Sequence, residues 1–301
     1  MEHKDSATSR RPMVISPRAA GTVLAALGVL AFSFSFPATV WALDGFGPWS
    51  ATGLRGAIAA LVATACLALF RAPLPTRRQW AALGVVAGGC AIGFPLLTTL
   101  ALQTSTTAHS AVVIGALPMA TAMLAAWRNG ERQPTAFWAA ACGGAVAVIG
   151  FTLVQHHGTV SIADVYLVAA LIVCAAGYAE GGRLSSSMSG WRVIAWGVVL
   201  AAPVNVAVSV WGLAHESVRW TPTALGGLAY VALVSQFLGF VAWYRGMGLI
   251  GVARASQLQL AQPLLTLVWA VLLMGEDLSA AAVITAVIVL SCIVMTQRVR
   301  R

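Results

Sequence analysis

The sequence predicts an all-α integral membrane protein with ten transmembrane helices, arranged as two inverted repeats of five. Three observations lead to this prediction: an apolar composition, ten apolar runs of membrane-spanning length, and a motif that recurs five helices later. Of the 301 residues, 59% are hydrophobic and only 9% are charged, whereas a soluble domain carries roughly 25% charged residues. Because so few polar side chains cannot cover a water-soluble body of this size, the composition excludes a soluble enzyme and a disordered chain.

Ten apolar runs have the length of a transmembrane helix, which needs roughly 20 mostly apolar residues. The first run follows a basic segment, as a signal peptide does, but it stays apolar for too long, and we expect it to be retained as a helix. The connections are short, so none of them predicts a separate soluble domain. The predicted helices cover residues 19–41, 48–70, 80–102, 107–127, 136–154, 162–183, 191–213, 223–246, 252–274 and 279–296.

The positive charges set the orientation of these helices. With the N-terminus in the cytoplasm, 16 of the 18 Lys and Arg residues fall in cytoplasmic segments, as the positive-inside rule requires. The exceptions are Arg55, inside the second run, and Arg219, in an outer loop. The sequence therefore predicts a multi-pass protein of the cytoplasmic membrane, with the basic tails 1–18 and 297–301 both in the cytoplasm. This topology also accounts for the net charge of +9 without a nucleic-acid partner.

The two halves of the chain share a motif at a constant offset of 145 residues. Because this offset corresponds to five helices, an odd number, the second half must cross the membrane in the opposite direction, as in many secondary transporters. The alternative is chance similarity between two Ala- and Leu-rich helices. The matched pairs are Ala108 and Ala253, Pro118 and Pro263, Gly130 and Gly275, Glu131 and Glu276, and, with a one-residue slip, Gly93-Phe94 and Gly239-Phe240.

These motifs resemble the EamA domain of the drug/metabolite transporter superfamily. An alanine, a proline and a Gly-Glu pair recur once in each half, Arg55 follows the start of the second run, and the segment Trp243–Ser256 precedes the ninth helix. The resemblance implies two repeats, at 19–154 and 162–296, around a central cavity that carries small metabolites or drugs, often outward. One departure is that helix 5 contains GGAVAVIG where helix 10 contains AVITAVIVL.

Pro118 and Pro263 lie near the middle of their predicted helices. A proline inside a helix releases the carbonyl four residues earlier, which here belongs to Ile114 and Gln259. In the hydrocarbon region such a carbonyl needs a partner or a water-lined cavity. The two prolines are therefore predicted to be hinges or cavity-lining kinks, with a purely structural kink as the alternative.

Polar side chains inside the predicted helices are candidates for contact with a solute, because they are costly in lipid. Gln259 and Gln262 share one face of helix 9 beside Pro263, and Gln236 and Trp243 share one face of helix 8. The alternative is that such groups make hydrogen bonds between helices. The predicted substrate-binding residues are Gln259, Gln262, Gln236, Trp243, Tyr178 and Asn205.

Three further residues are predicted to take part in ion coupling or gating. Glu180 can bind a cation or a proton, or can form an ion pair with Arg183 near the end of helix 6. His109, at the outer start of helix 4, is a possible protonation switch or an ordinary interfacial residue. Arg55 can bind an anionic group, or its side chain can extend outward to the vestibule.

The function that the sequence predicts is secondary transport of a small organic metabolite or drug by alternating access. The family resemblance implies export as its direction. No ATPase motif, metal cluster or cofactor motif is visible, so no cofactor is expected. The expected partners are a small-molecule substrate and the lipid bilayer, with the protein a monomer or homodimer. The alternatives are a flippase for a lipid or lipid-linked sugar, an intramembrane enzyme, and a receptor that transports nothing.

Overall fold

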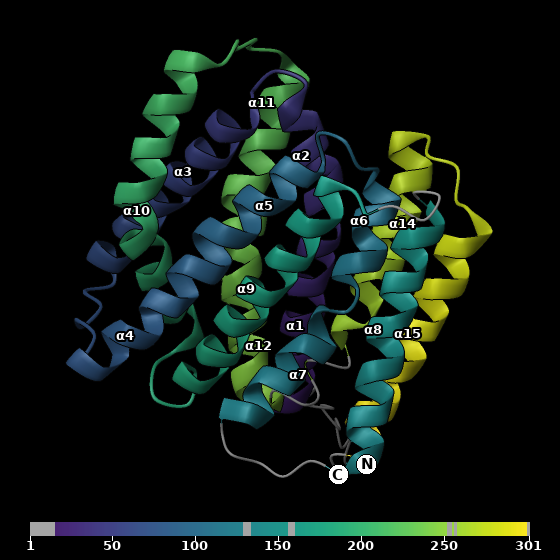
Figure 1. Ribbon diagram of the computed structural model, residues 1–301. Helices are drawn as coiled ribbons and strands as arrows, with labels where there is room; N and C mark the ends of the chain where they lie inside the picture. The colour runs from purple at the N-terminus through teal and green to yellow at the C-terminus, as the bar shows by residue number, and fades with distance from the viewer. Residues whose placement is uncertain (1–15, 129–133, 156–159, 252–254, 256–257, 300–301) are drawn as a thin grey trace, which may run out of the picture.

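The structure is a computed structural model that describes residues 16–128, 134–155, 160–251, 255 and 258–299. Throughout these ranges the regular secondary structure is helical, and the helices form one bundle (Figure 1). The predicted all-α fold is confirmed. The elements are α1 (Pro17–Ser33), α2 (Ser35–Leu43), α3 (Pro48–Leu69), α4 (Arg77–Val86), η1 (Ala87–Gly93), α5 (Phe94–Ala101), α6 (Thr107–Ile114), α7 (Leu117–Arg128), α8 (Thr135–Gln155), α9 (Ile162–Leu184), α10 (Gly190–His215), α11 (Pro222–Ala229), η2 (Tyr230–Gly239), α12 (Phe240–Ile250), α14 (Ala261–Met274) and α15 (Ala280–Val299).

These elements make ten spans, which coincide with the ten predicted runs. Span 1 is α1 and α2, span 3 is α4, η1 and α5, span 4 is α6 and α7, and span 8 is α11, η2 and α12; the other spans are single helices. Among the described residues, eight spans are long and apolar enough to cross a membrane, and the apolar helices of spans 9 and 10 are shorter. Ala255, Leu258 and Gln259, which precede α14, are also helical.

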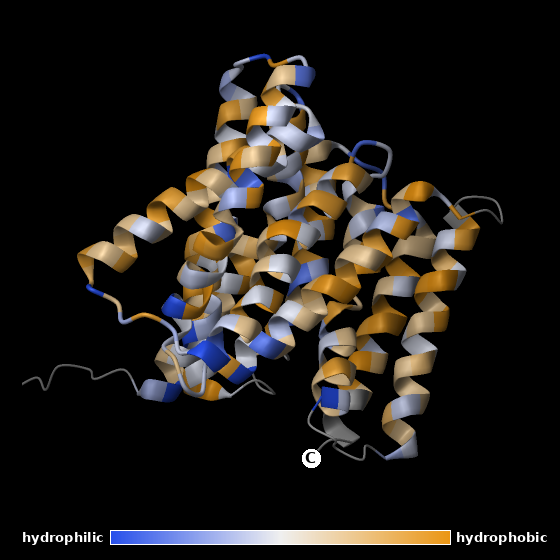
Figure 2. Cartoon of the chain, turned by 60° about the vertical axis from the view of Figure 1, so that its left-hand side comes forward, coloured by the Kyte–Doolittle hydropathy of each residue, from blue (hydrophilic) through white to orange (hydrophobic). Residues whose placement is uncertain are grey.

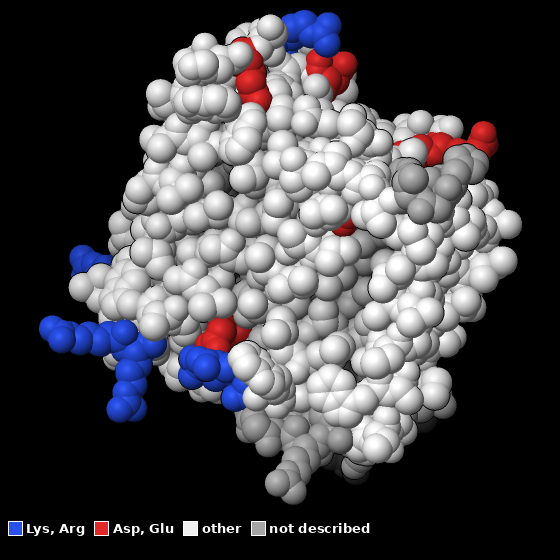
Figure 3. Space-filling view, viewed as in Figure 1, with Lys and Arg blue, Asp and Glu red and all other residues white. Residues whose placement is uncertain are grey.

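The side of the bundle is apolar and its charges gather at the two ends. Figure 2 shows hydrophobic residues along the outer faces of the helices, and Figure 3 shows most of the visible basic side chains near one end and most of the acidic ones near the other. We call these the basic end, which carries Arg71, Arg77, Arg78, Arg183 and Arg192, and the acidic end, which carries Asp44, Glu216, Glu276 and Asp277. That the basic end faces the cytoplasm stays a prediction.

The contacts between spans have the symmetry that an inverted repeat requires. Span 2 packs on span 7, span 4 on span 9, and span 5 on span 10, through α3 and α10, α6 and α14, and α8 and α15. Span 1 packs on span 8, and span 3 packs on span 6. If each span is replaced by the span five places away in the other half, each of the first three pairs is unchanged. The pair of spans 1 and 8 then becomes the pair of spans 6 and 3, and the reverse. The contact pattern therefore supports five helices repeated twice.

Spans 4 and 9 lie together and point in opposite directions. Glu276 follows α14, and its carboxylate accepts hydrogen bonds from the backbone N–H groups of Thr107 at 2.7 Å and Ala108 at 2.8 Å, at the start of α6. The end of α14 therefore lies beside the start of α6. Halfway along, a Cβ atom on Gly115 would lie 3.3 Å from Cβ of Pro263. The two proline regions therefore lie close together where spans 4 and 9 meet, while Glu131 lies outside the described residues.

Both prolines follow an interruption of their span. In span 4, α6 ends at Ile114 and α7 begins at Leu117, so Pro118 occupies the first turn of α7, where its missing N–H leaves no helical bond unmade. In span 9, Leu260 is in a turn just before α14, and Pro263 again lies in the first turn. Both spans are therefore interrupted next to their proline, and the role of the prolines as hinges stays a prediction.

The Gly-Phe pairs that match between the halves mark a second symmetric irregularity. The π-helical segment η1 ends at Gly93, immediately before Phe94, and the π-helical segment η2 ends at Gly239, immediately before Phe240. A π-helical turn displaces backbone carbonyls from the regular pattern and is frequent at functional sites. In η1, the carbonyls of Cys90 and Ala91 accept hydrogen bonds from side chains of spans 8 and 7.

Replacing Glu276 with alanine is expected to lower the stability of the protein by about 1 to 2 kcal/mol, because two N–H groups in the first turn of α6 lose their carboxylate partner. The measurement is the shift of the unfolding midpoint, followed by tryptophan fluorescence. Asp277→Ala is the matched control, because Asp277 is the exposed neighbour of Glu276. Equal midpoints for the two variants would show that the contact with α6 contributes nothing.

Candidate functional site

Two small cavities adjoin in the centre of the bundle and share the lining residues Phe36, Leu117, Gln262 and Thr266. We call the first the proline cavity, of about 10 Å³, because Pro118 and Pro263 line it. The second, of about 20 Å³, is the arginine cavity, because Arg55 lines it. Each volume has room for roughly one water molecule, so neither cavity holds an organic solute in this conformation.

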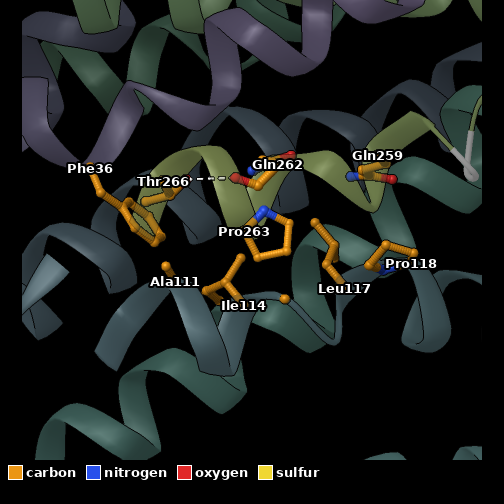
Figure 4. A pocket seen from close by; sticks show the side chains of 10 residues that line it. Phe36, Ala111, Ile114, Leu117, Pro118, Gln259, Gln262, Pro263 and Thr266 are labelled. Atoms are coloured by element: carbon orange, nitrogen blue, oxygen red, sulfur yellow. Dashed lines mark hydrogen bonds between the residues drawn. The ribbon is translucent and has the colours of Figure 1, made fainter. Parts of the chain in front are cut away.

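The proline cavity contains the two glutamines that the sequence predicts to contact a solute. Figure 4 shows Gln259 and Gln262 on the same segment as Pro263, across from Ile114 and Leu117. Among the described residues, Nε2 of Gln259 and Oε1 of Gln262 are buried and have no hydrogen-bond partner. An unpartnered buried polar atom costs on the order of 1 to 3 kcal/mol. These atoms therefore provide a donor and an acceptor that a polar solute can satisfy.

Thr266 fixes the segment that carries these glutamines. Its hydroxyl lies 2.8 Å from the carbonyl of Ser33 and 3.0 Å from the carbonyl of Gln262 (Figure 4). Ser33 ends α1, where span 1 is interrupted, and its own hydroxyl accepts a bond from Nε1 of Trp269 at 3.0 Å. The interrupted centre of span 1 is thus bonded to span 9. Thr266 is not among the residues that the sequence predicts for the site, although it lies one helical turn after Gln262.

Arg55 is buried, with only 5% of its surface exposed, and its guanidinium group points to span 8. Nε donates to Oε1 of Gln236 at 3.0 Å, and Nη2 donates to the hydroxyl of Ser235 at 3.2 Å. The expectation that this side chain extends outward to the vestibule is wrong, because it is held inside the bundle by polar side chains of span 8. Ser235 also lies 2.6 Å from the hydroxyl of Ser35.

Gln236 and Asn205 connect helices and line neither cavity. Nε2 of Gln236 donates to the carbonyl of Cys90 at 3.0 Å, and Nδ2 of Asn205 donates to the carbonyl of Ala91 at 3.3 Å. Both acceptors lie in η1, so the π-helical segment of span 3 supplies carbonyls to spans 7 and 8. For these two residues the structure shows the interhelical bonds that were the alternative.

Aromatic side chains form the wall of the arginine cavity toward the basic end. Tyr178, Phe32 and Phe240 line it, with the rings of Phe32 and Phe240 4.8 Å apart in an edge-to-face contact. Trp243 lies behind them, with its ring 6.3 Å from that of Phe32 and 6.2 Å from that of Tyr178. Tyr178 thus lies where the sequence predicts a contact with a solute, while Trp243 supports the wall from outside.

Glu180 forms ion pairs at the basic end. Its carboxylate lies 2.7 Å from Nη2 of Arg183, one turn along α9, and 2.8 Å from Nε of Arg128, the last residue of α7. Both arginines are more than half exposed. The ion-pair alternative holds for Glu180, with the addition that the pair also connects spans 4 and 6.

His109 is buried, although it lies in the first turn of α6 near the acidic end. Its Nε2 lies 2.6 Å from Oδ1 of Asp164, and its ring stacks on Phe151 at 5.0 Å. Asp164 also accepts bonds from the backbone and the hydroxyl of Ser161 at the start of α9. The sequence pattern Ser-x-x-Asp before an apolar run is that of a helix cap, and this signal could have identified Asp164. The switch role of His109 stays a prediction.

A wide vestibule lies at the acidic end. Its volume is about 600 Å³, and its lining includes Asp44, Gln103 and Arg219. Val40 of α2 lines this vestibule, and Phe36, one turn earlier on the same helix, lines both central cavities. One turn of α2 therefore separates the vestibule from the centre of the bundle.

Comparison with known proteins decides the family. The family model described as "EamA-like transporter family" matches twice, at residues 19–154 and at residues 161–297. The chain belongs to the EamA-like transporter family. The family resemblance that the sequence predicts is confirmed, and the protein is a multi-pass membrane transporter.

Among its relatives, this EamA-like chain is 42% identical over 272 residues to the Bacillus subtilis (strain 168) protein "Uncharacterized transporter YdeK", covering 90% of this chain and 95% of that protein. It is 24% identical over 284 residues to "Uncharacterized transporter YcbK" of the same organism, covering 90% of each. A solved structure titled "Crystal structure of protein" superposes with a TM-score of 0.65 at 19% identity, over 92% of this chain and 96% of that one. This likeness supports the fold alone.

Proposed function

We propose that this EamA-like transporter moves a small organic solute by alternating access, without a cofactor, and that the solute occupies the joined proline and arginine cavities. The observation that carries the proposal is the pair of amide atoms of Gln259 and Gln262 that have no partner within the described part of the chain. Dry helix contacts satisfy their polar groups, whereas a transport site leaves groups free for its solute. The site also lies between the halves, where secondary transporters of inverted-repeat design bind their substrates.

The proposed path of the solute is set by the barriers that separate the central cavities from each end of the bundle. Toward the acidic end, the turn of α2 from Phe36 to Val40 separates the cavities from the vestibule. Toward the basic end, the ion pairs of Glu180 with Arg128 and Arg183 close the contact between α7 and α9. The interruptions next to Pro118 and Pro263 adjoin the proline cavity, so that α7 and α14 can tilt about them. We place the basic end in the cytoplasm, and we propose export as the direction.

Replacing Gln262 with leucine is expected to reduce transport about 10-fold or more while leaving the unfolding midpoint unchanged or raised. A polar solute loses a hydrogen-bond partner, whereas the free protein loses a buried oxygen that has no partner among the described residues. The substrate is first identified by a thermal-shift screen of the purified protein with a metabolite library, since a ligand that binds the folded state stabilises it. Uptake of that solute into proteoliposomes is then compared between variants.

Ser291→Ala is the control for this measurement, because Ser291 lies on the exposed face of α15 and bonds only to its own helix at Val287. Its transport rate should equal that of the wild type. If Gln262 merely connected helices, its replacement by leucine would lower the unfolding midpoint and leave transport intact. That result would contradict the proposed site.

A further inference from the structure

We infer that Arg55 binds the anionic group of the substrate, and that the substrate is a small organic acid with one carboxylate and an apolar or aromatic body. This inference rests on the proposed function, because it names the class of solute that the same site takes. It follows from the partners of Arg55, from the walls of the arginine cavity, and from the placement of the carboxylates.

Arg55 carries a buried positive charge whose described partners are neutral. Its two bonds, to Gln236 and Ser235, use two of the five N–H donors of a guanidinium group. Within the described residues, no carboxylate lies within ion-pair distance of Arg55. Because an isolated buried charge costs several kcal/mol, the site favours an anion that supplies the missing charge.

The described carboxylates inside the bundle are occupied elsewhere. Asp164 bonds to His109, and Glu180 is paired with two arginines at the basic end. Glu216 accepts hydrogen bonds from the backbone N–H groups of Trp49 and Ser50 at the start of α3, and Glu276 accepts the equivalent bonds at the start of α6. None of these acidic residues lines the arginine cavity. The counter-ion of Arg55 is therefore expected to come with the solute.

The walls of the cavity indicate the shape of that solute. Around Arg55 are hydroxyl and amide groups, from Ser35, Ser235, Thr266 and Gln262. The remaining wall is aromatic, from Phe32, Phe36, Phe94, Phe240 and Tyr178. A planar carboxylate matches the fork of a guanidinium group, and a hydrocarbon or aromatic body fits the rings.

The same lining argues against two other classes of solute. A zwitterion such as an amino acid brings an ammonium group, and the described lining offers it no acidic side chain. A phosphate ester brings up to two negative charges, and Arg55 is the single cationic residue among the described residues that line the cavity. A monocarboxylate matches the one positive charge of the site.

The test uses the purified full-length protein and matched pairs of probes: benzoate and benzamide, 3-phenylpropionate and 3-phenylpropanamide, and butanoate and butanamide. Each pair has the same carbon skeleton and differs in charge. Binding is measured by the rise of the unfolding midpoint with probe concentration, followed by tryptophan fluorescence. We expect at least one carboxylate to raise the midpoint of the wild type, and its amide partner to leave it unchanged.

The variants assign the binding to Arg55. In Arg55→Gln the apparent Kd of the effective carboxylate should rise about 10- to 100-fold, as expected for the loss of a hydrogen bond to a charged group. Arg55→Lys, which keeps the charge and loses the fork, should fall between this variant and the wild type. If Arg55→Gln does not fold, Ser235→Ala is the second variant, because it removes one hydrogen-bond partner of Arg55 and keeps the arginine itself. The control variant Ser291→Ala should bind the carboxylate as the wild type does.

Three results would overturn the inference: equal effects of carboxylate and amide on the wild type, no effect of any carboxylate, or unchanged carboxylate binding in Arg55→Gln. The proposed function fails separately. A neutral solute that binds and is transported, and whose transport is lost in Gln262→Leu, would overturn the anion site and keep the transport site. If a carboxylate binds through Arg55 but is not taken up into proteoliposomes, the inferred anion site stands and the proposed transport function is contradicted.

Discussion

Replacing Gly53 with valine should abolish the yield of folded protein, and replacing it with alanine should cost about 3 kcal/mol of stability. Gly53 lies in α3 at the contact with α10, where a Cβ atom would be 2.4 Å from the backbone nitrogen of Ser209. Gly212 makes the reciprocal contact from α10, with its Cβ position 2.4 Å from the backbone nitrogen of Ser50. Because each glycine faces backbone atoms, a side chain can be accommodated only if the two helices move apart.

The measurement is the unfolding midpoint in detergent, together with size-exclusion chromatography of the valine variant. Gly226→Ala is the matched control, since Gly226 is an exposed helical residue and a Cβ atom there would meet nothing within 4 Å. That variant should gain up to about 1 kcal/mol, because alanine favours the helix. If Gly53→Ala and Gly226→Ala had the same midpoint, α3 and α10 could not be as close as the structure shows them.

The fold was predictable from the sequence to the level of spans and their order. Apolar runs of membrane-spanning length are required by the thickness of the bilayer, and the offset between Pro118 and Pro263 carries the orientation of the halves. The contact between α6 and α14 follows from the same repeat. The π-helical form of η1 and η2 did not follow, because the matched Gly-Phe pairs mark an equivalent position without indicating how the backbone is wound there.

The site was predictable only where a side chain and its helix face determine its surroundings. Gln259 and Gln262 line the same cavity because they are three residues apart, on either side of the turn at Leu260. The environments of Arg55 and His109 were missed, because they depend on partners about 180 and 55 residues away, Gln236 and Asp164. The spacing of apolar and polar residues within one helix does not indicate which distant residue will face a given side chain.

Replacing Asp164 with alanine is expected to destabilise the protein by about 3 kcal/mol, since a hydrogen bond to a charged group contributes about 1.5 to 3 kcal/mol and its loss leaves the buried ring nitrogen of His109 without this carboxylate partner. The side chains of His109 and Asp164 are 4% and 3% exposed, and their hydrogen bond is 2.6 Å long. The bond connects α6 of the first half to the start of α9 in the second half. Asp164→Asn should cost less, because an amide oxygen still accepts a hydrogen bond.

Asp164 also caps α9, and this second role has to be separated from the pair with His109. Ser161→Ala removes the hydroxyl that bonds to both the carboxylate and the backbone N–H of Asp164, and it should cost only about 1 kcal/mol, as the loss of an N-cap does. The pair itself is measured by a double-mutant cycle of His109→Ala and Asp164→Ala, read from denaturant or thermal unfolding. We expect a coupling free energy of about 2 kcal/mol, within the usual range for residues in contact. Strict additivity of the two substitutions would instead assign the stabilising effect of Asp164 to the helix cap, and the connection between the two halves at His109 would contribute nothing to stability.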